Sequence, residues 1–256
     1  MYLAVNCRSL LLCAAVVLLL PSSGDGLSAA GYSGATCRGS SLLQSGGLSC
    51  DVKKSILDAH NKYRQSIALG YVAGQPGAAR MLEMVWDEEL ASIAQRWADQ
   101  CTMGHDHNRD VSRFPVGQNV AATWTTRRQV SPEPDFARQI AAWYGEVAAF
   151  RYQDGSLGAA TGHYTQLVWG DTYLVGCGYS FFYDRSRGYT KLYVCNYGPG
   201  GNVVGAAPYE KGSPSCSSQG ISPSKRYPGL CEVRGYSQLG SQCSYTTFGG
   251  FSAFWG

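Results

Sequence analysis

The spacing of large apolar residues changes between the two halves of the chain. In the first half, three segments carry them every three or four positions, which predicts amphipathic helices over residues 51–68, 87–100 and about 135–150. Asp87 stands where the second helix needs an N-cap. The positions of the three stripes are Ile56, His60, Tyr63 and Ile67; Leu90, Ile93, Ala94, Trp97 and Cys101; and Phe136, Ile140, Trp143, Val147 and Phe150.

The second half contains short runs of aromatic and β-branched residues, separated by Gly and Asp. These runs predict strands over residues 164–169, 175–183 and 189–197, and the last two form an antiparallel hairpin. Because helices precede strands along the chain, the pattern favours a mixed α/β layer architecture over a doubly wound fold.

The predicted hairpin has a consequence for two cysteines. Its loop, residues 184–188, is centred on Ser186, so strands folded about that residue place Cys177 directly opposite Cys195. Directly opposed residues of antiparallel strands have Cα atoms about 4.5–5.5 Å apart, which is within reach of a disulfide. The sequence therefore predicts a Cys177–Cys195 disulfide, unless a β-bulge shifts the pairing by one residue.

The N-terminal end has the layout of a secretory signal. Leu10–Leu20 is an unbroken apolar run, preceded by Arg8 and followed by small residues. The run is too short to span a bilayer, so we assign residues 1–30 to a signal peptide, cleaved after Gly26 or Ala30. An N-terminal membrane anchor is the alternative interpretation. The signal predicts a secreted, extracellular protein without a transmembrane segment.

Composition divides the rest of the chain. Residues 31–49 are rich in Gly and Ser and predict a loop segment, residues 50–205 hold the predicted helices and strands, and residues 206–256 form a Pro/Ser/Gly-rich tail that contains cysteines. A net charge of +3 over 256 residues is too small to indicate a nucleic-acid partner.

Cysteines are numerous, at 10 in the chain, and Cys7 and Cys13 fall within the predicted signal. An even remainder in an oxidising compartment indicates disulfides, and the absence of C-x-x-C argues against a redox or structural zinc motif. The remaining cysteines are Cys37, Cys50, Cys101, Cys177, Cys195, Cys216, Cys231 and Cys243.

Histidines are few, at 4, so each can be considered. His60 lies on the apolar side of the first predicted helix, which predicts a buried, hydrogen-bonded histidine. His105 and His107 lie in a loop after the second helix, and His163 precedes the first predicted strand. Two distant histidines with the carboxylate of Glu146 are a candidate metal or acid–base site, but spacing alone does not define one. The chain has no complete hydrolase or phosphate-binding motif.

Several motifs, in order along the chain, resemble a known family. Residues 162–169 (Gly-His-Tyr-Thr-Gln-Leu-Val-Trp) and 195–202 (Cys-Asn-Tyr-Gly-Pro-Gly-Gly-Asn) are similar to the two signatures of the CAP superfamily, which groups cysteine-rich secretory proteins, antigen 5 and pathogenesis-related 1. The resemblance covers about residues 50–205 and is greatest to antigen-5-like proteins of arthropod venoms and salivas. Supporting matches are His60-Asn61-x-x-Arg64, Trp86-Asp87-Glu88-Glu89-Leu90, Trp97-Ala98-x-x-Cys101 and Gly117-Gln118-Asn119.

The resemblance implies a three-layer α-β-α sandwich with a central, mainly antiparallel sheet and a surface cleft. It assigns His105 and His163 to the cleft as metal ligands, and Gln118 and Glu146 as cleft-lining residues. Gln118 departs from the Glu that much of the superfamily has at this position. Because an amide cannot act as a base, general base catalysis would rest on Glu146 alone.

The loop around His105 departs from the family pattern. His107 could take the place of His105, but His105 followed by Asp106 matches the His-Asp pair of the family. Asn108 stands where antigen-5-like proteins typically have Cys, so the bridge from this loop to the N-terminal segment should be absent.

The resemblance also implies the remaining disulfides. Cys50–Cys101 would be the retained family bridge, Cys216–Cys231 the hinge bridge after the domain, and Cys37–Cys243 the remaining pair. Other pairings of Cys37, Cys216, Cys231 and Cys243 stay open, because four cysteines allow three pairings.

The family match and the absence of a complete catalytic motif favour a secreted binding or effector protein without established catalysis, similar to venom or salivary allergens. We expect a monomer that requires no cofactor and whose partner is an extracellular protein or a small lipid. One alternative is a zinc-dependent hydrolase, with Zn²⁺ on His105 and His163 and Glu146 as base. The other alternative is a carrier of sterol or another small lipid, which needs an apolar cavity.

Overall fold

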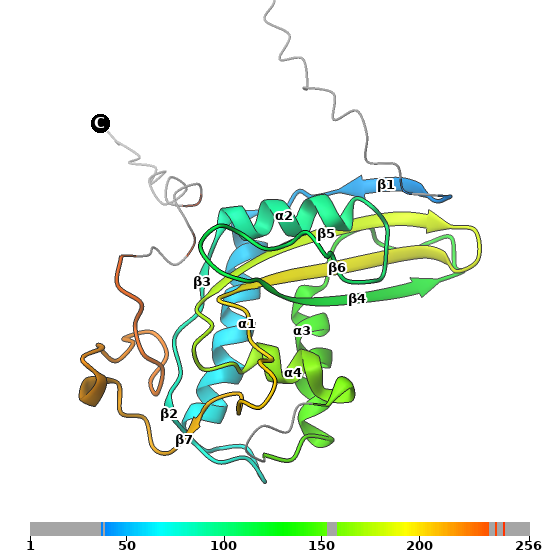
Figure 1. Ribbon diagram of the computed structural model, residues 1–256. Coiled ribbons are helices and arrows are strands. Elements are labelled where there is room, and N and C mark those ends of the chain that lie inside the picture. The colour runs from blue at the N-terminus through cyan, green and yellow to red at the C-terminus, as the bar shows by residue number, and fades with distance from the viewer. Residues whose placement is uncertain (1–36, 38, 153–157, 236–238, 240–242, 244–256) are drawn as a thin grey trace, which may run out of the picture. The chain divides into compact units, whose positions relative to one another are not determined.

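The three amphipathic segments fold as helices in the computed structural model, which describes residues 37, 39–152, 158–235, 239 and 243. α1 spans Cys50–Ala68, α2 spans Glu88–Ala98 and α3 spans Phe136–Gly145 (Figure 1). All described residues belong to one unit, Ala35–Gly256. The predicted signal at residues 1–30 lies outside the described residues.

Polar side chains fix where these helices begin. The predicted N-cap at Asp87 is confirmed, because its Oδ1 accepts the Leu90 N–H at 2.9 Å. Ser49 and Asp135 cap α1 and α3 in the same way. α3 is shorter than its stripe predicts: it ends at Gly145, a poor helix former, and Glu146–Ala148 continues as a 3-10 turn.

The main sheet has the strand order β1-β5-β6-β4, with β3 parallel to β5 and the other pairs antiparallel. β5 and β6 are the predicted hairpin, and their register places Cys177 opposite Cys195. A separate pair joins β2 to β7. The bounds are β1 Ser41–Ser45, β2 Ala78–Arg80, β3 Val85–Trp86, β4 Gly117–Thr125, β5 Leu174–Asp184, β6 Gly188–Gly198 and β7 Glu210–Lys211.

Helices cover both faces of this sheet (Figure 1). α2 lies on one face, and α1, α3 and the short helix α4 (Gly162–Leu167) lie on the other. α2 packs closely because Gly176 and Gly178 of β5 face it, and a Cβ at either position would collide with the α2 backbone. The opposite face carries the main apolar core, which includes Ile56, Trp143 and Tyr179. The predicted three-layer sandwich is confirmed.

The segment predicted as a strand over residues 164–169 is instead α4, so that prediction is wrong. A short apolar run cannot be assigned by period alone when it is buried on all sides, as Tyr164 and Leu167 are. Charged side chains satisfy both ends of the helix. The Glu146 carboxylate accepts N–H groups at its start, and the Arg64 guanidinium donates to carbonyl groups at its end.

Five strands among the described residues were not predicted: β2, β3 and β7, which are two or three residues long, and two that extend the hairpin. Ser41–Ser45 lies within the predicted loop segment 31–49 and forms β1 by pairing with β5. Gly117–Thr125 forms β4, which pairs along its full length with β6. Both strands attach to an edge of the hairpin, so their existence depends on a surface formed by residues distant in sequence.

Two of the predicted disulfides are present and two are wrong. Cys177–Cys195 and Cys216–Cys231 form as predicted. In place of Cys50–Cys101 and Cys37–Cys243, the structure pairs Cys37 with Cys101 and Cys50 with Cys243, with Cα–Cα distances of 5.0 and 5.6 Å. The pairing follows from the face of the sheet on which each cysteine lies. Cys37 and Cys101 share an apolar cluster with α2, whereas Cys50 begins α1 on the opposite face.

The part of the predicted tail that the structure describes is folded onto the sandwich. Tyr209, Tyr227 and Leu230 are buried in the main core. The buried carboxylate of Glu83 forms an ion pair with Arg226 at 2.6 Å. Within the residues described, none of the helices combines the length and apolar character required to cross a membrane.

Candidate functional site

The predicted site residues gather at the end of the sheet where β4 begins at Gly117 and β6 ends at Gly198, which we call the signature end. Gln118 is buried there. Its Oε1 accepts the Asp106 N–H at 2.9 Å and lies 3.1 Å from Nδ1 of His105. Its Nε2 donates to Asn196 Oδ1 at 2.9 Å. The amide of Gln118 therefore holds the His105 loop against the sheet.

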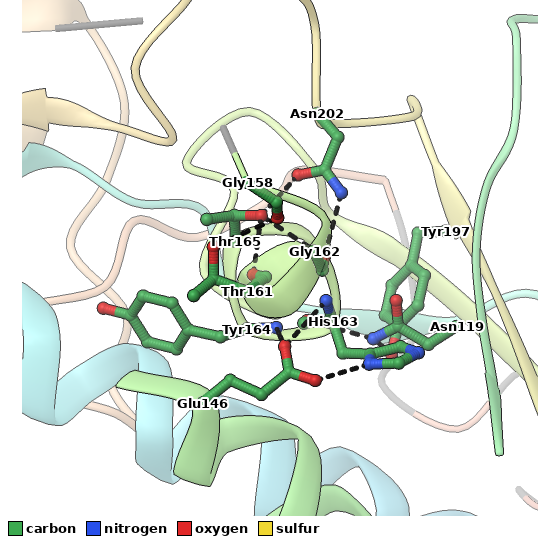
Figure 2. Close-up of polar contacts among 10 residues, drawn as sticks. All are labelled: Asn119, Glu146, Gly158, Thr161, Gly162, His163, Tyr164, Thr165, Tyr197 and Asn202. Carbon is green, nitrogen blue, oxygen red and sulfur yellow. Dashed lines mark hydrogen bonds and ion pairs between the residues drawn. The ribbon is translucent and has the colours of Figure 1, made fainter. Parts of the chain in front are cut away.

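Glu146 lies at the C-terminus of α3 and holds the start of α4 (Figure 2). Its Oε2 accepts the backbone N–H groups of His163 and Tyr164 at 3.0 and 3.1 Å. Its Oε1 lies 2.6 Å from Nδ1 of His163. The His163 ring also stacks on Trp143, with ring centroids 5.9 Å apart. Both carboxylate oxygens of Glu146 are thus occupied by this helix start.

Asn119 connects the helix start to the core (Figure 2). Its Nδ2 donates to the His163 carbonyl at 3.1 Å and to the Tyr197 hydroxyl at 3.3 Å. Two neighbouring residues of β4 therefore hold the two histidine segments: Gln118 bonds to the His105 loop, and Asn119 bonds to the His163 carbonyl. Neither Asn119 nor Tyr197 was singled out in the sequence, although both lie within family motifs.

His60 is the buried, hydrogen-bonded histidine that its position predicts. Its Nδ1 lies 2.8 Å from the Ile56 carbonyl and its Nε2 lies 2.9 Å from the Tyr197 hydroxyl. Burial lowers the pKa of His60 to about 4 and raises the pKa of Tyr197. Both groups are therefore neutral at physiological pH, which suits a structural role.

Arg64 is fully buried, and its partners are backbone carbonyl groups. Burial lowers its pKa to about 9. The guanidinium joins the end of α4 to the strand segment before β3. The acceptors are the carbonyls of Leu82, Leu167, Trp169, Gly170 and Thr172. Its place in the motif with His60 was the only signal that the sequence offered for this role.

A groove of about 480 Å³ opens at the signature end, between the two signature segments. His105 and Gln118 line it, together with Gln166 and the loop that follows β6. Glu146 and His163 are not among its lining residues. The sequence missed Gln166, whose Oε1 accepts the Gly201 N–H at 2.9 Å, and Asn202, whose Nδ2 donates to the Gly162 carbonyl at 2.9 Å.

The histidines meet only part of what a metal site needs. The described residues contain no group of three or more His, Cys, Asp and Glu that could hold a metal ion. His107, the other histidine of this loop, is exposed, as His105 is. Nδ1 of both His105 and His163 is hydrogen-bonded to a side-chain oxygen, which is how imidazole ligands are oriented in metal sites. The donor set of the described residues does not form a three-ligand zinc centre.

The structure is an α-β-α sandwich with four disulfides among its described residues. At one end of its sheet, His105 bonds to Gln118 and His163 bonds to Glu146. This is the class of protein that the signature segments predict. The family model described as "CAP: Cysteine-rich secretory protein family" matches residues 57–197. The chain belongs to this family.

Venom proteins are among the most similar relatives. The chain is 42% identical to venom allergen 5 of Tityus serrulatus over 203 residues, which cover 73% of this chain and 49% of the relative, so it spans about half of that protein. It is 41% identical to venom allergen 5.02 of Dolichovespula maculata over 182 residues, 68% of this chain and 83% of the relative. The resemblance to antigen-5-like proteins is therefore confirmed.

A solved structure has the same fold. The structure described as NaASP2 with Zn²⁺ superposes with a TM-score of 0.58 at 30% identity, over 72% of this chain and 97% of that protein.

Proposed function

We propose that the chain is a secreted binding protein, not an enzyme, and that the groove at the signature end is its binding surface. One observation carries this proposal: the polar groups that would perform acid–base chemistry are committed to hydrogen bonds within the fold. Three N–H donors occupy the Glu146 carboxylate. The oxygen and the nitrogen of the Gln118 side-chain amide are both hydrogen-bonded as well.

These bonds oppose general base catalysis. A general base must accept a proton from the reacting group, and Glu146 would have to release the start of α4 to do so. Leaving the N–H groups of His163 and Tyr164 without an acceptor would cost about 1–3 kcal/mol each. Gln118 cannot accept a proton at neutral pH. The same bonds support a rigid recognition surface, because a preorganised surface loses less entropy on binding.

The rim of the groove offers an apolar contact. Val203 lines the groove and is 54% exposed, and the adjacent Val204 is 95% exposed. An exposed aliphatic pair beside a polar groove suits a protein partner, which buries apolar side chains at the centre of an interface and pairs polar groups around them. We therefore propose an extracellular protein as the partner.

Secretion is part of the same proposal. Relatives found in venoms and the disulfides of the described residues support an oxidising, extracellular location. We further propose that residues 1–30 are the signal, that residues 50–205 form the CAP domain between the N-terminal segment 31–49 and the tail 206–256, and that the secreted protein is a monomer.

Affinity capture from extracellular fluid tests the proposal. Wild type should capture a defined protein, and Val203→Asp/Val204→Asp should lose it. Tyr71→Asp is the matched control, because Tyr71 is 77% exposed and does not line the groove. Turnover of an ester or peptide substrate that Glu146→Gln abolishes, with capture unchanged, would contradict the proposal.

Zinc binding is a second candidate function, favoured by the bonded Nδ1 of His105 and His163. Each leaves Nε2 without a hydrogen bond to a described residue and thus available to a metal. The two imidazoles would hold Zn²⁺, and water would complete its coordination; when bound, the metal would act as a Lewis acid. Calorimetric titration with Zn²⁺ should show binding that falls at acidic pH, because protonated imidazole cannot ligate.

The variants for this titration are His105→Ala and His163→Ala, with His107→Ala as a control in the same loop. Zinc binding should be lost in the first two and kept in the third. Equal binding by all variants would eliminate the site.

Carriage of a sterol or other small lipid stays a prediction from the sequence. The groove along α1 is lined by charged side chains and by apolar ones: Asp51, Lys54, Asp58 and Lys62, together with Ala59, Tyr63 and Ala137.

A further inference from the structure

Four exposed arginines gather at the opposite end of the sheet, where β5 turns into β6; we call this the hairpin end. Arg127 and Arg128 follow β4, and Arg185 and Arg187 lie in the β5–β6 turn. We call these four residues the arginine patch. The two loops are adjacent, because a Cβ on Gly188 would lie 3.2 Å from the Thr126 Cα. Figure 1 shows β4 ending beneath the hairpin turn.

The charge of the arginine patch is largely uncompensated. In the described part of the chain, none of the four guanidinium groups lies within 4.0 Å of a carboxylate oxygen. Asp184 is the acidic residue of the turn, and its Oδ1 accepts the N–H groups of Ser186 and Arg187 at 2.8 and 2.9 Å. Its carboxylate therefore fixes the turn and balances only part of the positive charge.

A groove of about 490 Å³ continues from the patch along β4 and β6. Trp124, which is 57% exposed, lines this groove, and the guanidinium carbon of Arg187 lies 5.6 Å from the centre of its ring. Tyr189 lines the groove as well. Arg138 and Lys191 add two cations to it, facing Asp135, which lines the groove, and Glu133, whose carbonyl accepts a hydrogen bond from the Lys191 ammonium at 2.7 Å. The groove thus combines aromatic walls, cations and polar side chains.

We propose that the arginine patch and this groove bind a sulfated polysaccharide. Guanidinium groups match the geometry of sulfate oxygens with paired N–H donors, as they do for phosphate and carboxylate. The aromatic walls offer faces to sugar rings, and the polar lining of Thr123 and Gln139 offers partners for hydroxyl groups. This surface is separate from the groove of the proposed function, since the two grooves share no lining residue and come nearest along β4 at Thr123 and Gln118, about 16 Å apart along the strand.

Other polyanions match these features less well. A nucleic acid carries one phosphate per nucleotide along an extended backbone, whereas the four arginines of this surface come from two adjacent loops at one end of the sheet. An anionic membrane would meet the exposed rim only and leave the half-buried Lys191 side of the groove unused. A sulfated chain can place charge on the rim and a sugar ring in the groove.

A heparin decasaccharide is the probe, and its Kd for the disulfide-bonded protein is measured by surface plasmon resonance at 0.15 M NaCl. Replacing the arginine patch by Arg127→Gln, Arg128→Gln, Arg185→Gln and Arg187→Gln together should weaken binding at least about tenfold. Trp124→Ala alone should weaken it about threefold or more, because it removes the aromatic wall. Lys211→Gln/Lys225→Gln is the control for loss of surface charge and should change Kd less than about twofold.

An unchanged Kd in the quadruple variant would overturn the proposal. An equal loss of affinity per removed charge in the lysine control and in the quadruple variant would overturn it too. Competition by desulfated heparin as strong as by heparin would also overturn it. Tighter binding of phosphatidylserine vesicles or of a single-stranded oligonucleotide than of the decasaccharide would show that the partner belongs to another class.

Discussion

The two ends of the central sheet differ in where their polar side chains lie. At the signature end, Gln118, Asn119 and Asn196 are buried and bonded to one another or to the backbone. At the hairpin end, the arginine patch is exposed to solvent. The same hairpin and the same neighbouring strand, β4, connect the two ends. Buried polar residues at the signature end thus hold the fold together, whereas the exposed arginines of the hairpin end make few contacts within it.

The largest effect that would test this difference is the loss of Arg64. Arg64→Met should lower the free energy of unfolding by roughly 3–5 kcal/mol, because several buried carbonyls lose their donor. Denaturation by urea measures the loss. Arg234→Met, at an exposed arginine, should change stability by less than about 0.5 kcal/mol. Equal losses in both variants would break the comparison.

The pH dependence of stability comes next in size. The pKa of His60 in the folded state is about 4, below its value of 6.5 in the unfolded chain, so the unfolded state takes up the proton first as pH falls. The contribution of His60 is present above about pH 6.5 and is lost as pH falls toward 4, with a total of about 3 kcal/mol. Urea denaturation of wild type and His60→Gln between pH 7 and 4.5 measures it. If the free energy of unfolding of His60→Gln depended on pH as steeply as that of wild type, His60 would not be the source of the pH dependence.

Two carboxylates, one at each end, give a matched comparison. Glu146 accepts three hydrogen bonds, and Asp184 accepts three within its turn and a longer one from Ser40 at 3.4 Å. Glu146→Ala should cost about 2 kcal/mol, because it uncaps α4 and releases His163 within the fold. Asp184→Ala should cost clearly less, because water replaces its bonds in the exposed turn. Thermal unfolding of both variants checks the order, and a larger loss for Asp184→Ala would reverse the comparison.

The smallest effect is expected for the arginine patch itself. Replacing all four arginines by Gln should change the free energy of unfolding by less than about 0.5 kcal/mol, because they form no ion pair among the described residues and repel one another. Calorimetric unfolding measures this change. A loss of several kcal/mol would mean that the hairpin end also holds the fold together.

Local patterns predicted much of this fold. The apolar stripes placed α1, α2 and α3, and the symmetry of the loop about Ser186 placed Cys177 opposite Cys195. The position of His60 on the apolar side of α1 predicted its burial. In each case the relevant interaction acts between residues close in sequence or between two strands joined by a short turn, so the order of residues is sufficient.

The sequence predicted which residues form the candidate site but not how they are arranged. Family motifs identified His105, Gln118, Glu146 and His163, but not that the Glu146 carboxylate caps α4. A carboxylate that follows a helix has no sequence feature that reports which N–H groups it will meet. The separation of the groove from His163 likewise depends on how α4 is placed against β4.

The sequence by itself determined the three amphipathic helices, the hairpin, one internal disulfide and the family. Only the tertiary structure decided that Cys101 pairs with Cys37 and not with Cys50, that residues 162–167 form a helix, and that four arginines from two loops meet at one end of the sheet. The physical reason is the distance along the chain between the residues that interact. Periodicity and turn symmetry operate over a few residues, whereas these contacts depend on which face or edge of the completed sheet a distant segment reaches.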